Sequence, residues 1–278
     1  MNVLSLFDGM SCGQIALDKL GIKVNKYFAS EIKKSAIEVT QHNYPNTIQL
    51  GDVTKIKAKD LPKIDLLIGG SPCQDFSRAN KERKGVDGEK SSLFFEYIRL
   101  LKESKPKYFL LENVIMSDYN YWFICNELNC EPVRLCGSLV SGALRDRLYW
   151  TNIPPFSYDL TGRLISQITA PKDKLITLSS ILDSGYVKTR KHTCLNTGSG
   201  NGGKQEYLIH RNNTTGMITL IYEDDYVRTV NQNEMEKLHN IPKGYTSIVN
   251  QKKAGDLIGD GWTVDIVKHI FKGIKKNK

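Results

Sequence analysis

One cysteine stands where a catalytic nucleophile could lie. Residues 66–68, Leu-Leu-Ile, predict a buried strand of a parallel sheet, and two glycines end it. Pro72 then fixes the backbone directly before Cys73. Because ligands of open α/β sheets bind outside the carboxyl ends of the strands, Cys73 is a candidate nucleophile. The competing interpretation is an unreactive, half-buried cysteine, which is the commoner kind.

Acidic residues stand at the ends of three other predicted strands. Glu31 and Asp52 end the second and third strands, and Glu112 closes the fifth. A carboxylate after the second strand can accept hydrogen bonds from both hydroxyl groups of a ribose, and one after the third can accept a bond from an adenine amino group. Each acid alone is more often a solvated or capping residue. Together the first two predict an adenosine pocket, with Glu112 adjacent to Cys73.

Two arginines and a basic loop add positive charge near these residues. Arg145 and Arg147 are two positions apart before an apolar strand, so they share one face of an extended chain. They are either surface charges or groups that reach the site. The polar residues 78–90 predict a mobile loop over the site. The six cysteines and five histidines form no CxxC pair and no zinc-binding pattern, which predicts a reduced protein without a structural metal.

The elements that must position these residues alternate between strand and helix over the first half of the chain. The first loop has glycines at 9 and 13 and is not a GxGxxG sequence, which disfavours NAD. The alternation predicts an α/β fold of the nucleotide-binding type. The expected strands are 3–7, 26–30, 47–50, 66–68, 107–114 and 133–139, and the expected helices are 14–20, 35–42, 118–129 and one between Ser92 and Pro106.

The pattern changes after Pro154-Pro155. We expect a catalytic and cofactor-binding domain over 1–154 and a small, loop-rich region over 155–254, in which 228–238 predict a capped helix. Residues 255–278 predict a final segment whose amphipathic helix returns to the first domain.

The overall charge bears on the partner. A formal charge of +9 and a pI of about 9.1 favour a polyanion, usually nucleic acid, although a lysine-rich surface explains the charge equally well. No secretory signal or membrane span is recognisable, so we expect a cytoplasmic protein without a membrane partner.

Six segments in this order resemble motifs of the cytosine-C5 DNA methyltransferase family. They cover its first cofactor motif, catalytic motif, Glu-Asn-Val motif, paired arginines, late bracing motif and final motif, at 7–13, 70–74, 112–114, 144–147, 228–234 and 259–264. Only about 156–223 lies outside the match. The Phe-Asp-Gly opening and Gly-Asp-Gly-Trp ending are closest to the de novo branch. Ala143 stands where the bacterial pattern has a glutamine, which puts one hydrogen bond of the site in question.

The resemblance implies a Rossmann-like, S-adenosylmethionine-dependent methyltransferase fold with a small target-recognition domain. It implies methyl transfer to C5 of a cytosine flipped out of duplex DNA. Cys73 would add to C6 of the base, and Glu112 would protonate or hydrogen-bond N3. Arg147 would bind the base O2, and Arg145 would help to hold the site. The implied cofactor-binding residues are Phe7, Asp8, Gly9, Met10, Glu31, Ile32, Asp52, Val53, Pro72, Leu93, Gly261 and Trp262.

Two alternatives remain at this point. One is a tRNA cytosine-5 methyltransferase of the same fold, and the other is a catalytically inactive, DNA-binding member of the family. The expected partner is double-stranded DNA, bound by a monomer in a restriction-modification, orphan or phage-protection context. Any cognate restriction enzyme would act separately.

Overall fold

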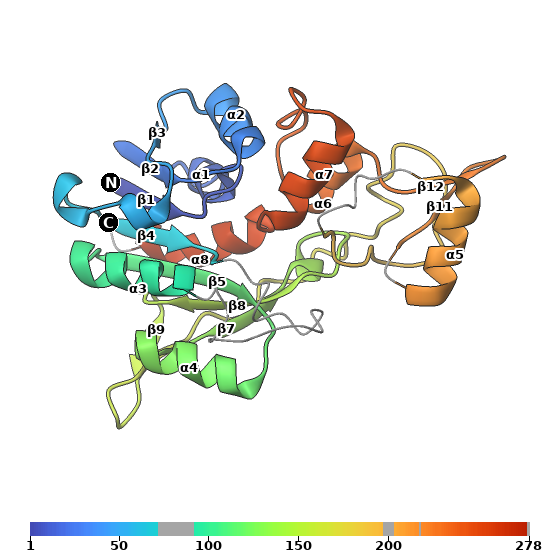
Figure 1. The fold of residues 1–278 in the computed structure, drawn as a ribbon. Coiled ribbons are helices and arrows are strands. Elements are labelled where there is room, and N and C mark those ends of the chain that lie inside the picture. The colour runs from blue at the N-terminus through green and yellow to red at the C-terminus, as the bar shows by residue number, and fades with distance from the viewer. Residues whose placement is uncertain (72–91, 197–202, 217, 277–278) are drawn as a thin grey trace.

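A seven-stranded sheet forms the centre of the molecule (Figure 1). The computed structural model describes residues 1–71, 92–196, 203–216 and 218–276. The strand order is β3-β2-β1-β4-β5-β8-β7, in which the first five strands are parallel, β8 is antiparallel to β5, and β7 is antiparallel to β8. The strands are β1 (Asn2–Leu6), β2 (Lys26–Ser30), β3 (Ile48–Gln49), β4 (Leu66–Gly69), β5 (Tyr108–Val114), β7 (Val133–Cys136) and β8 (Asp146–Thr151).

Helices cover both faces of the sheet because its strands alternate apolar side chains between two cores. In β4, Leu66 and Ile68 join the core beneath α1 (Cys12–Asp18), α2 (Lys34–Asn43) and α8 (Val264–Lys276). Leu67 joins the core beneath α3 (Ser92–Ser104) and α4 (Asp118–Leu128) on the other face. This arrangement confirms the predicted α/β fold of the nucleotide-binding type.

The second half of the chain contains helices that the sequence pattern did not predict. They are α5 (Gln205–Thr215), in which only Leu208 is buried, and α7 (Gln251–Asp260). The helix expected at 228–238 begins later, as α6 (Gln232–Leu238), because Asn231 and Glu234 form a capping box there. The preceding Val227–Arg228 is instead β12, which pairs with β11 (Ile221–Tyr222). A second small sheet joins β6 (Cys130–Glu131), β10 (Leu164–Ser166) and β9 (Phe156–Tyr158).

The end of the chain packs beside its beginning. Helix α8 lies against α1, where Lys19 and Asp265 form an ion pair at 3.1 Å. A Cβ atom at Gly273 of α8 would lie 1.9 Å from the carbonyl oxygen of Pro154, so only glycine allows this approach. The core beneath α8 continues through Ile181 and Leu195 into the region of residues 155–254, which we call the recognition region after its predicted role.

Candidate active site

One edge of the sheet gathers most of the predicted site residues. The carboxyl ends of the parallel strands β1 to β5 meet at this edge. The first loop follows β1, Glu31 follows β2, Asp52 lies beyond β3 and Gly70 follows β4. In open α/β sheets, this edge is where ligands bind.

The loop after β1 is fastened to the end of β2. The Gly9 N–H donates to Glu31 Oε2 at 2.8 Å, and the Asp8 N–H donates to the carbonyl of Ser30 at 3.1 Å. Glu31 Oε1 accepts the backbone N–H groups of the next two residues at 2.8 Å each. Phe7 and Gly9 both have positive φ, 56° and 58°, so the loop holds a turned conformation that costs energy at Phe7.

Asp8 points into the protein from this loop. Its carboxylate accepts hydrogen bonds from Tyr27 Oη at 2.8 Å and from Ser11 Oγ. Loss of surrounding water raises the pKa of Asp8 to about 6, and the hydrogen bonds from Ser11 and Tyr27 reduce that rise. At neutral pH, ionised Asp8 therefore destabilises the folded protein, compared with an aspartate that is fully in water.

The predicted adenosine side of the site exposes one large apolar residue. Ile32 is 75% exposed directly after Glu31. Asp52 Oδ1 accepts both the N–H and the hydroxyl of Thr54, at 3.0 and 2.9 Å, and these bonds lower the pKa of Asp52. Val53 is buried beside it, and Leu93 of α3 is half-buried.

The predicted base side of the site is organised around Glu112 of β5. Arg147 of β8 pairs with it, with 3.0 Å between Nε and Oε1, and both side chains are almost buried. Burial opposes the charge of the Arg147 guanidinium, but the Glu112 carboxylate raises its pKa. A Cβ atom at Gly70 would lie 3.1 Å from Glu112 Oε2 and 3.1 Å from Trp262 Nε1. Gly70 therefore lies against both, three residues before Cys73.

The final predicted motif closes over the first loop. A Cβ atom at Gly261 would lie 3.2 Å from Met10 Cε and 3.0 Å from Cys12 Sγ. Tyr245 Oη also donates to the Met10 carbonyl at 2.7 Å. Met10 is fully buried by these contacts, and Trp262 is 9% exposed. Residues 235 to 251 positions apart in the sequence therefore meet at this edge.

The guanidinium group of Arg145 donates hydrogen bonds to backbone carbonyls inside the protein. Its Nη1 donates to the carbonyl of Leu195 at 3.1 Å, and its Nη2 donates to the carbonyl of Gly259 at 3.1 Å. The side chain is buried. Arg145 thus ties the start of β8 to the recognition region and to α7.

The sequence analysis did not identify two further residues that lie near Arg145 and Arg147. The Cys194 thiol lies 3.5 Å from Arg145 Nη1 and 3.8 Å from Arg147 Nη2. His239 is fully buried, and burial together with the charges of the two arginines lowers its pKa well below the usual value. No local motif marks either residue, because both reach the arginines from segments about 50 to 95 positions away.

Cys73 and Pro72 lie outside the described residues, as does the predicted loop over 78–90. The described chain before them ends at Ser71, which is buried. Asn113 Nδ2 of β5 donates to Ser71 Oγ at 3.2 Å. The Glu-Asn-Val segment is therefore bonded to the residue two positions before Cys73.

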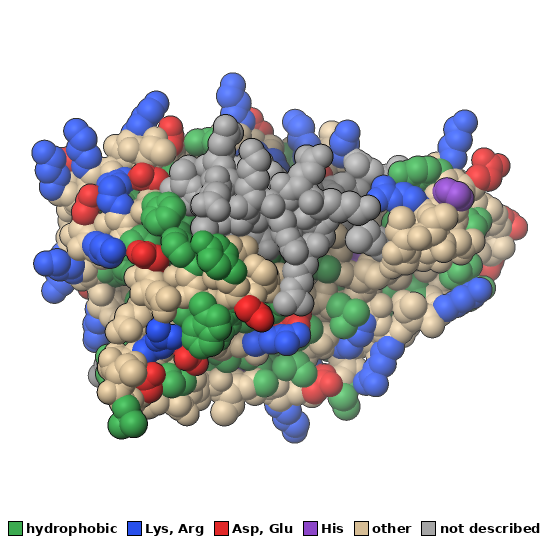
Figure 2. Space-filling view, turned by 60° about the horizontal axis from the view of Figure 1, so that its bottom comes forward, with side chains coloured by type: hydrophobic (Ala, Val, Ile, Leu, Met, Phe, Trp, Pro, Cys, Tyr) green, Lys and Arg blue, Asp and Glu red, His purple; other side chains and the backbone are tan. Residues whose placement is uncertain are grey.

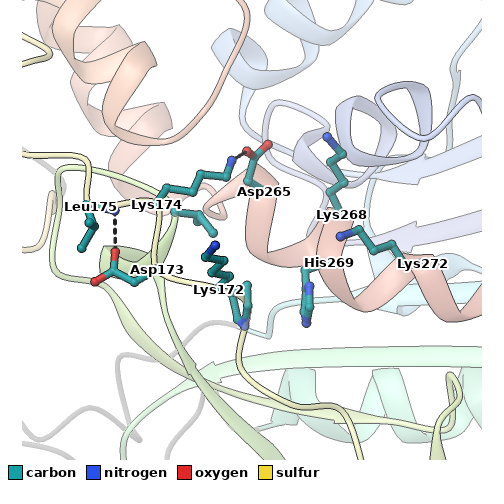
Figure 3. Close-up of a pocket in the computed structure, with 10 residues that line it drawn as sticks. Lys172, Asp173, Lys174, Leu175, Asp265, Lys268, His269 and Lys272 are labelled. Atoms are coloured by element: carbon teal, nitrogen blue, oxygen red, sulfur yellow. Dashed lines mark hydrogen bonds and ion pairs between the residues drawn. The ribbon is translucent and has the colours of Figure 1, made fainter.

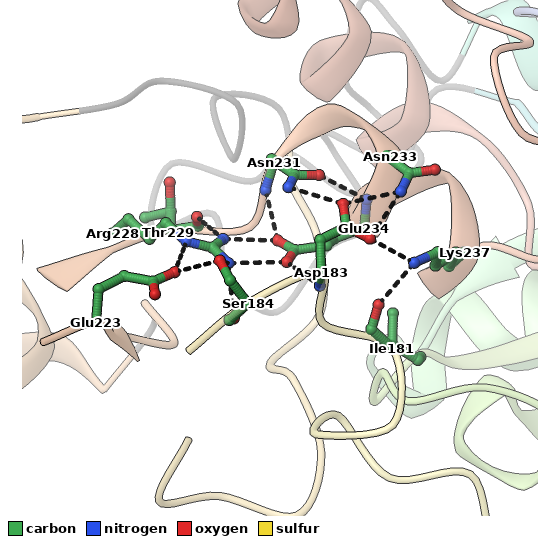
Figure 4. Close-up of polar contacts among 10 residues, drawn as sticks. All are labelled: Ile181, Asp183, Ser184, Glu223, Arg228, Thr229, Asn231, Asn233, Glu234 and Lys237. Carbon is green, nitrogen blue, oxygen red and sulfur yellow. Dashed lines mark hydrogen bonds and ion pairs between the residues drawn. The ribbon is translucent and has the colours of Figure 1, made fainter. Parts of the chain in front are cut away.

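A polar network braces the recognition region against α6 (Figure 4). Arg228 Nη1 and Nη2 donate to the two oxygens of Glu234 at 2.8 and 2.9 Å, and Nε pairs with Glu223 Oε1 at 2.6 Å. Glu234 is fully buried and also accepts the Asp183 N–H at 2.9 Å. Lys237 donates to Asp183 Oδ1 at 2.7 Å. This network fixes the segment around Asp183 to the first turns of α6.

Other kinds of site are not evident in the part of the chain that the structure describes. Within it, no group of three or more acidic, cysteine or histidine side chains is placed to hold a metal ion. None of the helices described is both long and apolar enough to span a membrane.

Sequence comparison finds relatives for the first part of the chain. Residues 1–117 match the family model for C-5 cytosine-specific DNA methylases. The orphan methyltransferase M.Rho11sI of Bacillus phage rho11s is 46% identical over 116 residues, which are 41% of this chain and 23% of that protein. The type II methyltransferase M.NlaIV of Neisseria lactamica is 44% identical over 115 residues, 40% of this chain and 27% of that protein. The aligned segment thus spans about a quarter of these relatives.

Structural comparison extends the likeness to the whole chain. The methyltransferase EhMeth of Entamoeba histolytica superposes with a TM-score of 0.74 at 15% identity, covering 100% of this chain and 98% of that one. A DNMT2 mutant of Spodoptera frugiperda superposes with a TM-score of 0.67 at 18% identity, covering 99% of both chains. At these identities the comparison establishes a Rossmann-like methyltransferase fold.

Proposed function

Because residues 1–117 match the family model for C-5 cytosine-specific DNA methylases, we propose that the chain belongs to that family and methylates C5 of cytosine in duplex DNA. The observation that carries the proposal is the buried Glu112–Arg147 pair beside Gly70, at the strand end that leads to Cys73. A base placed there would meet a carboxyl group and a guanidinium together. The target cytosine must leave the duplex to reach them.

The residues at the sheet edge suit S-adenosylmethionine. A Cβ atom at Gly9 would meet nothing within 4 Å, so there is open space beside the first loop. Glu31 would hold the ribose, the exposed Ile32 would cover the adenine, and Asp52 would accept its amino group through the oxygen that Thr54 does not use. Phe7, Asp8, Met10, Val53, Pro72, Leu93, Gly261 and Trp262 would complete the site. When bound, the cofactor supplies an electrophilic methyl group.

The proposed chemistry requires a reversible nucleophile. The Cys73 thiolate would add to C6 of cytosine, while Glu112 protonates or hydrogen-bonds N3 and Arg147 binds O2. This addition makes C5 electron-rich, so that C5 can form a bond to the carbon of the methyl group that the cofactor supplies. Loss of the C5 proton and elimination of Cys73 would then restore the aromatic ring. Cys12 and Cys130 are poor alternatives, because burial raises the pKa of each thiol to about 12.

We predict that Cys73→Ser abolishes methyl transfer and leaves cofactor binding nearly unchanged, because a serine hydroxyl is a far weaker nucleophile at neutral pH. Transfer of labelled methyl groups and calorimetry of cofactor binding measure the two effects separately. Turnover at the wild-type rate would refute the assignment. It would also be refuted if Cys125→Ser, a change at a buried thiol, removed activity equally.

The main competing function is that of a tRNA cytosine-5 methyltransferase of the same fold. The fold match to a DNMT2 protein is the reason to test this alternative. Parallel assays with labelled cofactor on duplex DNA and on tRNA separate the two. Transfer to tRNA alone would overturn the DNA proposal. Bisulfite sequencing of DNA from cells that express the protein tests the same point and identifies the target sequence. Wild-type protein that binds DNA and cofactor without transfer would indicate an inactive family member.

A further inference from the structure

A basic pocket lies away from the predicted site residues, between α8 and the segment after β10 (Figure 3). Its volume is about 650 Å³. Four lysines, one histidine and two aspartates line it, together with apolar side chains, and none of them is among the residues proposed for methyl transfer. The lining residues are Val140, Pro171, Lys172, Asp173, Lys174, Leu175, Asp265, Lys268, His269 and Lys272.

The negative charges in the pocket are already neutralised or hydrogen-bonded. Asp265 pairs with Lys174 at 2.6 Å and with Lys19 at 3.1 Å. Although burial raises it, these two lysines hold the pKa of Asp265 below its usual value. Asp173 Oδ1 accepts the N–H of Leu175 at 2.7 Å. The pocket therefore has positive charge that its own acids do not balance.

The four lysines of the lining outnumber its two aspartates by two. In the described part of the chain, Lys172, Lys268 and Lys272 have no ion pair. Lys268 and Lys272 are one turn apart on α8, a spacing at which like charges repel each other. Figure 3 shows Lys172 and Lys272 reaching into the same space from opposite walls. An anion bound between Lys172 and Lys272 would offset the charge of Lys272 and so reduce its repulsion with Lys268.

The walls are held in place without a ligand. The Lys174 N–H donates to the Leu139 carbonyl at 2.8 Å, and His269 Nε2 bonds to the Thr169 carbonyl at 2.9 Å. Leu175 has a positive φ of 56°, which this bonded segment maintains. Because the walls are already fixed, mainly the lysine side chains need to become ordered when a ligand binds.

We propose that this pocket binds a phosphate group, carried either by the nucleic acid outside the catalytic cleft or by a free phosphorylated ligand. Lysine ammonium groups bind phosphate as point charges, and a phosphate matches the excess of lysines over aspartates. The volume leaves room for a group attached to the phosphate, against Val140 and Pro171. The proposal does not depend on methyl transfer.

Calorimetry with pyrophosphate as the probe tests the site in the full chain. We expect K172E/K272E to weaken binding at least tenfold while the unfolding temperature stays within a few degrees of wild type. The matched control is K57E/K59E, which makes the same charge change at two exposed lysines, one directly before and one within η2 (Ala58–Asp60), a segment packed on α3 across the sheet. Its binding should equal that of the wild type. No binding to the wild type, or equal loss in both variants, would overturn the proposal.

Binding of labelled 12- and 40-base-pair duplexes at several salt concentrations distinguishes the two sources. If the nucleic acid supplies the phosphate, K172E/K272E weakens only the long duplex and lowers its salt slope by about 0.9 for each lost contact. If a free ligand supplies it, duplex binding is unchanged while pyrophosphate binding is lost. Neither measurement requires turnover, so a failure of the proposed methylation would be recognised separately.

Discussion

At the scale of single residues, the site depends on a carboxylate and a guanidinium that neutralise each other out of water. The side chains of Glu112 and Arg147 are 11% and 14% exposed and lie 3.0 Å apart. Removing one charge from such a pair leaves the other buried without compensation. The pair therefore contributes both to the proposed chemistry and to the stability of β5 and β8.

We predict that Glu112→Gln lowers methyl transfer by about 10²- to 10⁴-fold, because the amide cannot deliver a proton to the base. It should also cost about 2–4 kcal/mol of unfolding free energy, since Arg147 loses its counter-charge. Steady-state kinetics and urea unfolding measure the two effects. Glu131→Gln is the control: its partner Arg163 is 3.9 Å away and more exposed, so the cost should stay below about 1 kcal/mol. Wild-type turnover in the Glu112 variant would contradict the role.

Asp8 predicts a pH dependence of stability. Its pKa is raised from 3.8 to about 6 in the folded protein. A group whose folded pKa is raised stabilises the protein fully below its unfolded pKa and loses that contribution as pH rises through the folded value. Ionised Asp8 should therefore cost about 3 kcal/mol at pH 7.5 relative to pH 3.5.

The variant Asp8→Asn removes this titration. Its unfolding free energy relative to wild type should increase steadily between about pH 4 and pH 6.5 and then level off. Urea unfolding at four pH values across this window provides the test. A difference that does not change with pH would show that Asp8 does not titrate there. Asp159→Asn is a suitable control, because hydrogen bonds from Thr161 and Arg163 lower the pKa of Asp159.

At the scale of elements, α6 holds the recognition region through one buried carboxylate. Glu234 closes the capping box of α6 and also receives both terminal nitrogens of Arg228. A helix of seven residues gains little stability from its own hydrogen bonds. Its contacts with β12 and the segment at Asp183 must therefore fix its position.

We predict that Arg228→Met costs about 3–5 kcal/mol, because it leaves Glu234 buried without a counter-charge. Glu223→Gln should cost much less, since Arg228 keeps its bonds to Glu234. Limited proteolysis should show faster cleavage near Asp183 in the first variant only, while cofactor binding at the sheet edge is retained. Equal effects of the two changes would contradict the dominant role of Glu234.

At the scale of the whole molecule, Arg145 connects three distant parts of the chain. It joins the start of β8 to Leu195 in the recognition region and to Gly259 in α7. Figure 2 shows that lysine and arginine side chains are spread over the visible face and do not form a single patch there. Arg145 therefore acts as a structural tie between the sheet and the parts of the chain that close over it.

We predict that Arg145→Met costs roughly 2–4 kcal/mol, because two buried carbonyls lose charged donors. Hydrogen exchange should become faster near residues 195 and 259 together. The control Arg134→Met removes an exposed partner of Asp146 and should cost less than about 1 kcal/mol. Faster exchange at only one of the two segments would contradict the tie.

Much of the fold and the positions of the strand-end acids could be predicted from the sequence. The apolar runs of β1, β2, β4 and β5 and the residues directly after them are local features, and parallel strands must present those residues at one edge. The helix α5 could not be predicted in the same way, because only Leu208 of its eleven residues is buried and its pattern is polar. The expected helix started at residue 228, whereas α6 starts after Asn231 because the side chain of Asn231 caps its first turn. The predicted span did not take this cap into account.

The sequence by itself determined the order of the motifs, the candidate nucleophile Cys73 and the acids Glu31, Asp52 and Glu112. Only the tertiary structure decided that Arg145 donates hydrogen bonds to two backbone carbonyls and to the Cys194 thiol. It alone also placed Gly70 against Glu112 and Trp262, and brought the buried His239 close enough for the charges of the two arginines to lower its pKa. The physical reason is distance along the chain. A strand and its terminal residue follow from neighbouring side chains, whereas contacts across 50 to 250 residues exist only after the sheet, its helices and α8 have packed together.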